Sequence, residues 1–213
     1  MIIYSPDHMI PGRIKEAEKI LEKLPYRYCF ITGTFLYNKK YKDVDVFAIT
    51  RSKKKIQTKK RIKLSIIDFN ELHSLFYHSI SKMCVAKEVL PKKELRATVA
   101  NYWSIINETV PTLINEKENF RKAIRSLVLH TEYLENNKIL NSYELRTLIH
   151  SFKNYGDVLE YIKIHAAIAI KNKAKEGYIK RYFYTQAGFH KHNIQYAGQK
   201  DLYDISHAIA QAA

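Results

Sequence analysis

The sequence changes character near residue 90, and this change limits the folds that the chain can adopt. Runs of β-branched and aromatic residues at Tyr28–Thr32, Val44–Thr50 and Ile62–Phe69 predict three short strands. After residue 90, apolar residues recur at helical spacing and no β pattern competes. We therefore expect an α+β protein, with a strand-rich core flanked by helices in residues 1–90 and a helical bundle in residues 91–213.

Proline residues limit two helices that the first part of the chain predicts. One spans about Pro11 to Leu24 and ends before Pro25, and the other spans about Leu72 to Val89 and ends before Pro91. Four further helices are expected in the second part: Leu95–Asn107, Phe120–Glu135, Tyr143–Phe152 and Val158–Lys175. Their expected N-cap residues, for three of the four, are Asn119, Ser142 and Asp157.

Charge and cysteine content exclude several protein classes. Thirty-six Lys and Arg against 21 Asp and Glu leave a formal charge of +15, which indicates a polyanionic partner without naming a function. No stretch approaches the roughly 20 apolar residues of a membrane span. The first residues lack a basic segment followed by an apolar core, so we expect no secretory signal. Cys29 and Cys84 are too few for a disulfide framework. We expect a soluble, cytoplasmic protein with both cysteines reduced and with no membrane partner.

The densest basic run extends from Arg51 to Lys63 and holds eight basic residues and no acid. It connects the second and third predicted strands. Two interpretations remain open from the run alone: a solvated hairpin that keeps the surface soluble, or a loop that contacts phosphates.

Three aspartates and a glycine form the pattern most informative about chemistry. Asp43 and Asp45 stand two residues apart at the start of the second strand, so their side chains share one face. Paired carboxylates repel each other and are best tolerated with a divalent cation such as Mg²⁺ between them. An antiparallel third strand would bring Asp68 beside them, with Glu71 as a substitute in another register. Before them, Gly33 allows a phosphate close to the backbone and Thr34 adds a hydroxyl.

These elements, in this order, resemble the nucleotidyltransferase superfamily that includes DNA polymerase β. The resemblance covers about residues 13–75 and is greatest to the minimal and the small antibiotic- and tRNA-modifying members. Thr34 stands in place of the more usual Ser, and Lys42 in place of a frequent Ser. The resemblance implies a mixed sheet flanked by helices, two Mg²⁺ ions and a nucleoside triphosphate.

The same resemblance implies roles for individual residues in a catalytic domain of residues 1–90. The expected catalytic and metal-binding residues are Asp43, Asp45 and Asp68. The expected nucleotide-binding residues are Gly33, Thr34, Lys53, Lys54 and Lys55.

The helical part, residues 91–213, is expected to bind the acceptor or nucleic acid. From Tyr178 to Tyr203, aromatic residues alternate with cations and no acid occurs between Glu176 and Asp201. This composition suits base stacking and phosphate contacts, although a packing segment with solvated cations is the alternative. Across the chain, the expected nucleic-acid-binding residues are Lys59, Lys60, Arg61, Lys180, Arg181, Tyr182 and Lys191.

A second pattern in the helical part is Arg125 followed five residues later by His130. The spacing looks like the ribonuclease motif of helical HEPN domains. A surface arginine with a packed histidine is the alternative, and the pair is offset around a helix.

The function expected from the sequence is Mg²⁺-dependent transfer of a nucleoside monophosphate from an NTP to an acceptor hydroxyl. The basic surface favours RNA, such as a tRNA 3′ end, over a cationic antibiotic as the acceptor. Transfer to a protein or another small molecule stays open, as does a non-catalytic, antitoxin-like module that binds nucleic acid or a partner. The sequence predicts neither the NTP nor the oligomeric state.

Overall fold

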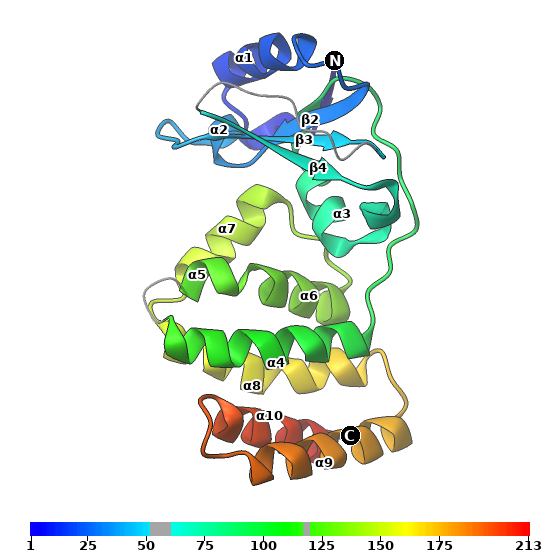
Figure 1. Ribbon diagram of the computed structural model, residues 1–213, viewed down its shortest axis with the longest axis vertical. Helices are drawn as coiled ribbons and strands as arrows, with labels where there is room; N and C mark the ends of the chain where they lie inside the picture. Colours follow the sequence, from blue (N-terminus) through cyan, green and yellow to red (C-terminus); the bar gives the residue numbers. More distant parts are fainter. Residues whose placement is uncertain (52–60, 117–119) are drawn as a thin grey trace. The chain divides into compact units, whose positions relative to one another are not determined.

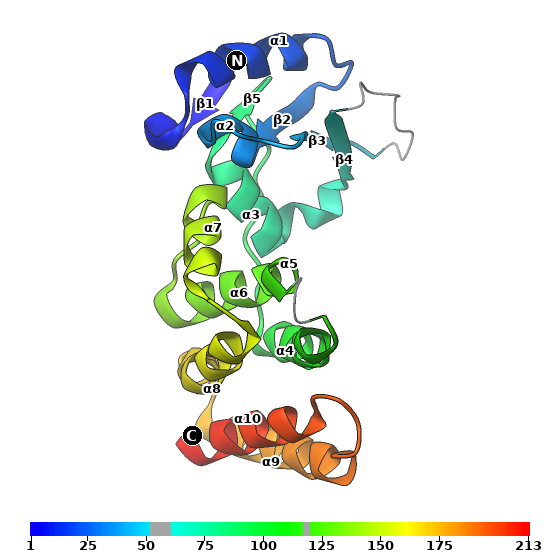
Figure 2. The ribbon, with the colours of Figure 1, turned by 90° about the vertical axis from the view of Figure 1, so that its left-hand side faces the viewer.

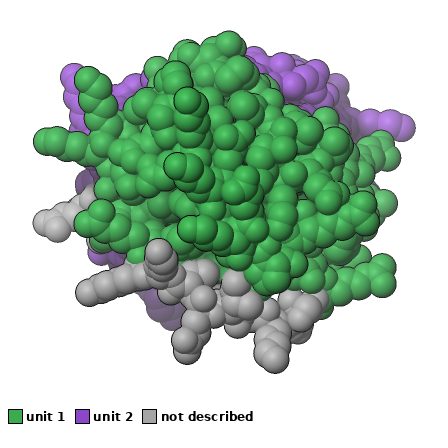
Figure 3. Space-filling model, turned by 90° about the horizontal axis from the view of Figure 1, so that it is seen from above, with its two compact units in different colours: residues 1–96, 140–146 green, residues 97–139, 147–213 purple. Residues whose placement is uncertain are grey.

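The computed structural model describes residues 1–51, 61–116 and 120–213, which divide into two compact units (Figure 3). Unit 1 comprises Met1–Arg96 and Leu140–Arg146, and unit 2 comprises Ala97–Ile139 and Thr147–Ala213. Unit 1 thus continues past Pro91 and takes in a segment from the middle of the helical region. No pattern in the sequence predicted this second contribution.

Unit 1 is built on a five-stranded mixed sheet in the order β1-β5-β2-β3-β4 (Figure 2). The strands are β1 (Ile2–Tyr4), β2 (Tyr28–Thr32), β3 (Val44–Ile49), β4 (Ile62–Ile67) and β5 (Cys84–Ala86). Strands β3 and β4 are parallel, and every other neighbouring pair is antiparallel. The expectation of an α+β protein with a mixed sheet, flanking helices and a C-terminal helical region is confirmed.

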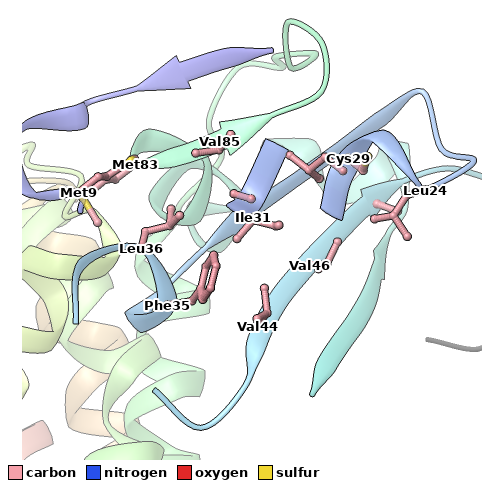
Figure 4. Packing of buried hydrophobic residues seen from close by; sticks show 13 residues of the cluster. Met9, Leu24, Cys29, Ile31, Phe35, Leu36, Val44, Val46, Met83 and Val85 are labelled. Carbon is pink, nitrogen blue, oxygen red and sulfur yellow. The ribbon is translucent and has the colours of Figure 1, made fainter. Parts of the chain in front are cut away.

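Helices cover both faces of the sheet because successive strand residues point to opposite sides. On one face, Val44, Val46 and Ala48 pack with Ala17 and Leu21 of helix α1 (Pro11–Glu22) in the cluster of Figure 4. On the other face, Phe30, Ile49 and Ile67 pack with Tyr77 and Ile80 of α3 (Leu75–Lys82). The short helices of unit 1 are η1 (Pro6–His8), α2 (Thr34–Tyr37) and η2 (Phe69–His73).

The prediction of a helix from Leu72 to Val89 is wrong for the second half of this range. The helical segment ends at Lys82, and residues Cys84, Val85 and Ala86 form β5, which lies between β1 and β2. All three side chains are fully buried, and β5 is paired on both sides. A three-residue strand has no alternation long enough to recognise, so its backbone pairing in the sheet overrides the local helical pattern.

Unit 2 is helical, as expected. Its helices are α4 (Val99–Asn115), α5 (Phe120–Ala123), α6 (Arg125–Asn136), the later part of α7 (Ser142–Ser151), α8 (Tyr155–Lys171), α9 (Glu176–His192) and α10 (Gln199–Ala212). The single helix expected over Phe120–Glu135 is two helices. Helices α9 and α10 lie side by side in both ribbon views (Figures 1 and 2). In the described part of the chain, no helix is long and apolar enough to cross a membrane.

Trp103 anchors the core of unit 2. Its ring lies edge-on to Phe183 with centroids 5.0 Å apart, and its indole Nε1 donates to Gln186 Oε1 at 3.1 Å. A second buried contact joins α4 to α6, where Tyr102 and Thr131 share a hydrogen bond of 2.7 Å. The contacts of Trp103 with Phe183 and Gln186 show which face of α9 is turned inward.

Candidate functional site

Gly33 lies where β2 ends, directly beside the start of β3. Its backbone has φ 85° and ψ −166°, a region that is essentially restricted to glycine. The register Thr32↔Asp45 brings the two strand ends together, so a Cβ atom on Gly33 would lie 3.2 Å from Asp45 Oδ2. The glycine thus lets the Asp45 carboxylate lie against the bare backbone. The sequence analysis expected Gly33 and the two aspartates to serve one phosphate and metal site, and the pairing of β2 with β3 brings Gly33 and Asp45 together.

Asp43 and Asp45 present two carboxylates at the start of β3. Asp43 directly precedes the strand and Asp45 is its second residue, so both side chains leave the same face of the sheet. That is the face on which α3 packs, since Ile49 of the same strand belongs to the α3 cluster. The Asp43 side chain keeps 18% of its surface exposed, so it remains open to solvent and to a ligand.

Lys63 is a site residue that the sequence analysis did not identify as such. The parallel register of β3 and β4 pairs it with Asp45, and its Nζ forms an ion pair with Asp43. The hydrogen bond with Asp43 and the attraction of that charge raise the pKa of Lys63 above 10.5, so the ammonium stays protonated at neutral pH. A cation therefore stands where the sequence analysis expected a third carboxylate. Only the parallel pairing reveals it.

Asp68 does not join the other two aspartates, which corrects its expected place. Because β4 runs parallel to β3 rather than antiparallel, Asp68 follows the far end of β4, about 16 Å along the strand from Lys63. There it caps η2: its Oδ1 accepts from Asn70 N at 2.8 Å, and Glu71 Oε2 accepts from Asp68 N at 2.7 Å. Glu71 lies at the same far end and cannot substitute for it.

The segment Leu140–Arg146 reaches the same edge of the sheet within unit 1. Thr32, which precedes Gly33, donates from its buried hydroxyl to Met83 O at 2.8 Å and lies 3.4 Å from Ser142 Oγ. Tyr37 of α2 donates to Ser142 O at 3.3 Å. Asn141, rather than the expected Ser142, caps α7 by accepting from two backbone N–H groups. Nothing in the sequence linked these residues to Gly33.

The remaining expected residues have separate places. Thr34 is the first residue of α2 and Arg61 is exposed just before β4, where its carbonyl accepts from Val44 N. On α6, Arg125 is exposed, whereas half-buried His130 bonds Ser126 O through Nδ1 at 2.8 Å. Lys180, Arg181, Tyr182 and Lys191 belong to α9 in unit 2.

Lys53, Lys54, Lys55, Lys59 and Lys60 lie outside the described residues. The strands beside the basic run are parallel, which excludes a simple hairpin.

The donor set at this edge fits Mg²⁺ bound together with a triphosphate. Mg²⁺ is commonly held by one or two carboxylates, with water and substrate phosphates completing its shell. Asp43 and Asp45 provide the two carboxylates, and Gly33 leaves space for a close approach. Among residues 1–51, 61–116 and 120–213, no group of three or more His, Cys, Asp or Glu side chains is placed to hold a metal ion. The two-ion arrangement thus lacks its expected third carboxylate.

We compared the chain with protein families, curated proteins and solved structures. No family model, no curated protein and no solved structure matches the chain.

Proposed function

We propose that this protein is a Mg²⁺-dependent nucleotidyltransferase that moves a nucleoside monophosphate from an NTP to an acceptor hydroxyl and releases pyrophosphate. One observation carries the proposal: Gly33, in a conformation reserved for glycine, lies against Asp45 of the Asp43-x-Asp45 pair. A backbone without a Cβ beside two carboxylates suits a metal-bound triphosphate better than it suits an ordinary turn. The proposal uses a single Mg²⁺ ion, because Asp68 is too far away to help hold a second one.

The residues of this chain would act mainly by binding and orienting the triphosphate. Asp43 and Asp45 would hold the cation, which would supply positive charge to neutralise the pyrophosphate leaving group. Gly33 would admit the phosphates to the backbone. Lys63 is paired with Asp43 in the free protein and would turn towards phosphate oxygens when Asp43 binds the cation. A flexible lysine side chain can make this exchange without any movement of the backbone.

RNA is the acceptor that the charge of the chain favours. The formal charge of +15 exceeds what an NTP alone would require. Arg61 is exposed directly before β4, at the end of the strand where Lys63 pairs with Asp45. A protein or small-molecule hydroxyl as acceptor is then an alternative outcome of the transfer assay.

A labelling experiment tests this function with a matched pair of variants. The protein is incubated with α-³²P-labelled NTPs and Mg²⁺ in the presence of bulk RNA, protein or small molecules. Asp45→Asn should lower the transfer rate by about 100-fold or more, since removing groups that merely support a metal ligand already costs 10- to 100-fold. Asp68→Asn should leave it unchanged, because asparagine also caps a helix and the residue lies at the far end of β4. Equal loss in both variants would contradict the assignment.

A non-catalytic nucleotide-binding module is the second candidate, and Lys63 is the observation that favours it. With a lysine paired with Asp45 in the sheet, the described residues place two carboxylates here, which are sufficient for binding a metal-bound nucleotide but include no third acid to activate a hydroxyl. Mg²⁺-dependent NTP binding that Asp45→Asn abolishes, together with no label transfer to any acceptor, would identify this module instead.

A further inference from the structure

The outward face of helix α9 carries aromatic rings and cations with almost no acidic residues. Tyr178, Arg181, Thr185, Phe189 and His192 are exposed along this face, with Tyr178 42% and Phe189 61% accessible. The opposite side of the helix is the buried one: Ile179, Phe183, Ala187 and His190. The exposed rings are therefore additional to those that build the core of unit 2.

Two of the rings already form a stacked pair. Tyr178 and Tyr182, one helical turn apart, have centroids 5.6 Å apart and planes inclined by only 12°. Phe189 continues the same flank of the helix, about 16 Å further along the axis from Tyr178. A flat ring platform with one face in solvent is what an unpaired base needs for stacking, and stacking tolerates any base.

Positive charge surrounds these rings. Residues 171–200 contain seven Lys or Arg and one acid, Glu176, which is paired with Lys180 at 2.6 Å. Among the residues that the structure describes, neither Arg181 nor Lys191 forms an ion pair. Arg181 lies one turn from Tyr178 and from Thr185, so it shares this exposed side of the helix with the rings, whereas Lys191 lies on the other flank. Rings for bases and an unpaired cation for a phosphate occur here on one side of a single helix.

We propose that the exposed face of α9 binds single-stranded polynucleotide, with bases stacked on Tyr178, Tyr182 and Phe189 and a phosphate contacted by Arg181. The proposal is independent of nucleotidyl transfer and requires no NTP. A second copy of the chain fits this face less well, because a symmetric contact would bring like charges together. A lipid surface fits less well too, since Thr185, Gly188 and His192 interrupt the apolar side chains.

Fluorescence anisotropy with short labelled oligonucleotides tests the proposal on the full chain. Phe189→Ala and Tyr178→Ala should each weaken binding by about 5- to 100-fold, the usual effect of removing one stacked ring. Phe76→Ala is the matched control, since Phe76 on α3 is 53% exposed and belongs to unit 1. Arg181→Gln should weaken binding and reduce the salt dependence by about one phosphate contact, whereas Lys122→Gln on α5, with the same loss of charge, should not. Circular dichroism confirms that each variant is folded.

A comparison of RNA, DNA and duplex ligands decides which polynucleotide this face binds. RNA and DNA single strands of one sequence should both bind, and a preference for RNA would assign the face to RNA. Duplexes that bind as tightly as single strands would overturn the proposal, because their bases are not available for stacking. The proposal would also be overturned if Phe76→Ala weakened polynucleotide binding as much as Phe189→Ala does. Two other results would overturn it: self-association of the protein that is lost in Phe189→Ala, or binding to anionic lipid vesicles that Phe189→Ala abolishes. Asp45→Asn should bind polynucleotide normally, which separates this proposal from the proposed transfer activity.

Discussion

Substitution of Gly33 by alanine examines the geometry of the candidate site most directly. The glycine has φ 85° and ψ −166°, where a Cβ atom meets steric conflict with the backbone, and that Cβ would lie 3.2 Å from Asp45 Oδ2. Ordinary carbon–oxygen contacts begin at about 3.4 Å, so the carboxylate would have to move by a few tenths of an ångström. Gly33→Ala therefore has two effects: it strains the backbone, and it displaces Asp45, one of the two expected metal ligands.

The size of the stability effect follows from these two terms. Residues held in such sparsely populated backbone regions cost about 1–3 kcal/mol. The gain of about 0.4–1 kcal/mol that alanine brings by restricting the unfolded chain is not expected here, because it requires a native backbone that alanine can adopt and Gly33 has a positive φ. We expect Gly33→Ala to lower the free energy of unfolding by about 1–3 kcal/mol. The same displacement of Asp45 should weaken Mg²⁺-dependent NTP binding.

Urea unfolding followed by circular dichroism measures the first effect, and calorimetric titration with NTP and Mg²⁺ measures the second. Gly12→Ala is the control: Gly12 is the second residue of α1, has no atom within 4 Å of a Cβ position and lacks a positive φ. That variant should gain about 0.4–1 kcal/mol and bind NTP normally. If the two alanine variants were equally stable and bound NTP equally well, the reasoning about Gly33 and Asp45 would be refuted.

Two further predictions concern charged and titratable groups. Lys63→Gln should tighten the binding of Mg²⁺ alone a few-fold, because the ammonium no longer competes for Asp43, while weakening the binding of the metal-bound NTP. Pairing with Asp43 raises the Lys63 pKa, so this difference is expected at neutral pH, and weaker Mg²⁺ binding by the variant would contradict it. Burial lowers the His130 pKa below 6.5, so the unfolded chain takes up its proton first and stability should fall as pH decreases below neutral. His130→Gln should reduce this acid-dependent loss in urea unfolding between pH 7 and 5, and an unchanged pH profile would count against it.

Much of the fold followed from local patterns. The apolar and β-branched runs predicted β2, β3 and β4 at nearly their observed positions, and Pro11 with Pro25 located α1. Local backbone and side-chain preferences suffice for such elements because their runs are long and strongly periodic. β1 and β5 were missed, since three residues carry too little pattern and their strand structure depends on partners distant in the chain.

The candidate site was predicted in part. Gly33 and Asp45 were expected at one site from the order of the motif along the chain, and the antiparallel pairing of β2 with β3 brings them together. The direction of β4 was not predictable from its residues, because parallel and antiparallel strands share one composition. Because β4 pairs in parallel with β3, Lys63 lies beside Asp45, where Asp68 was expected. The segment that carries Ser142 is more than a hundred residues from Thr32 in the chain, and only its packing within unit 1 reveals the contact.

The sequence by itself determined the α+β class, the basic charge and the neighbourhood of Gly33 with Asp43 and Asp45, because each depends on residue type and on contacts between near neighbours in the chain. The tertiary structure alone decided which third side chain joins the two aspartates and which face of α9 remains in solvent. Both depend on how segments distant in sequence pair and pack, through backbone hydrogen bonds of the sheet and burial of Phe183 and Ile179 in the helical unit. Those interactions are nearly independent of the identity of the exposed residues that they bring together.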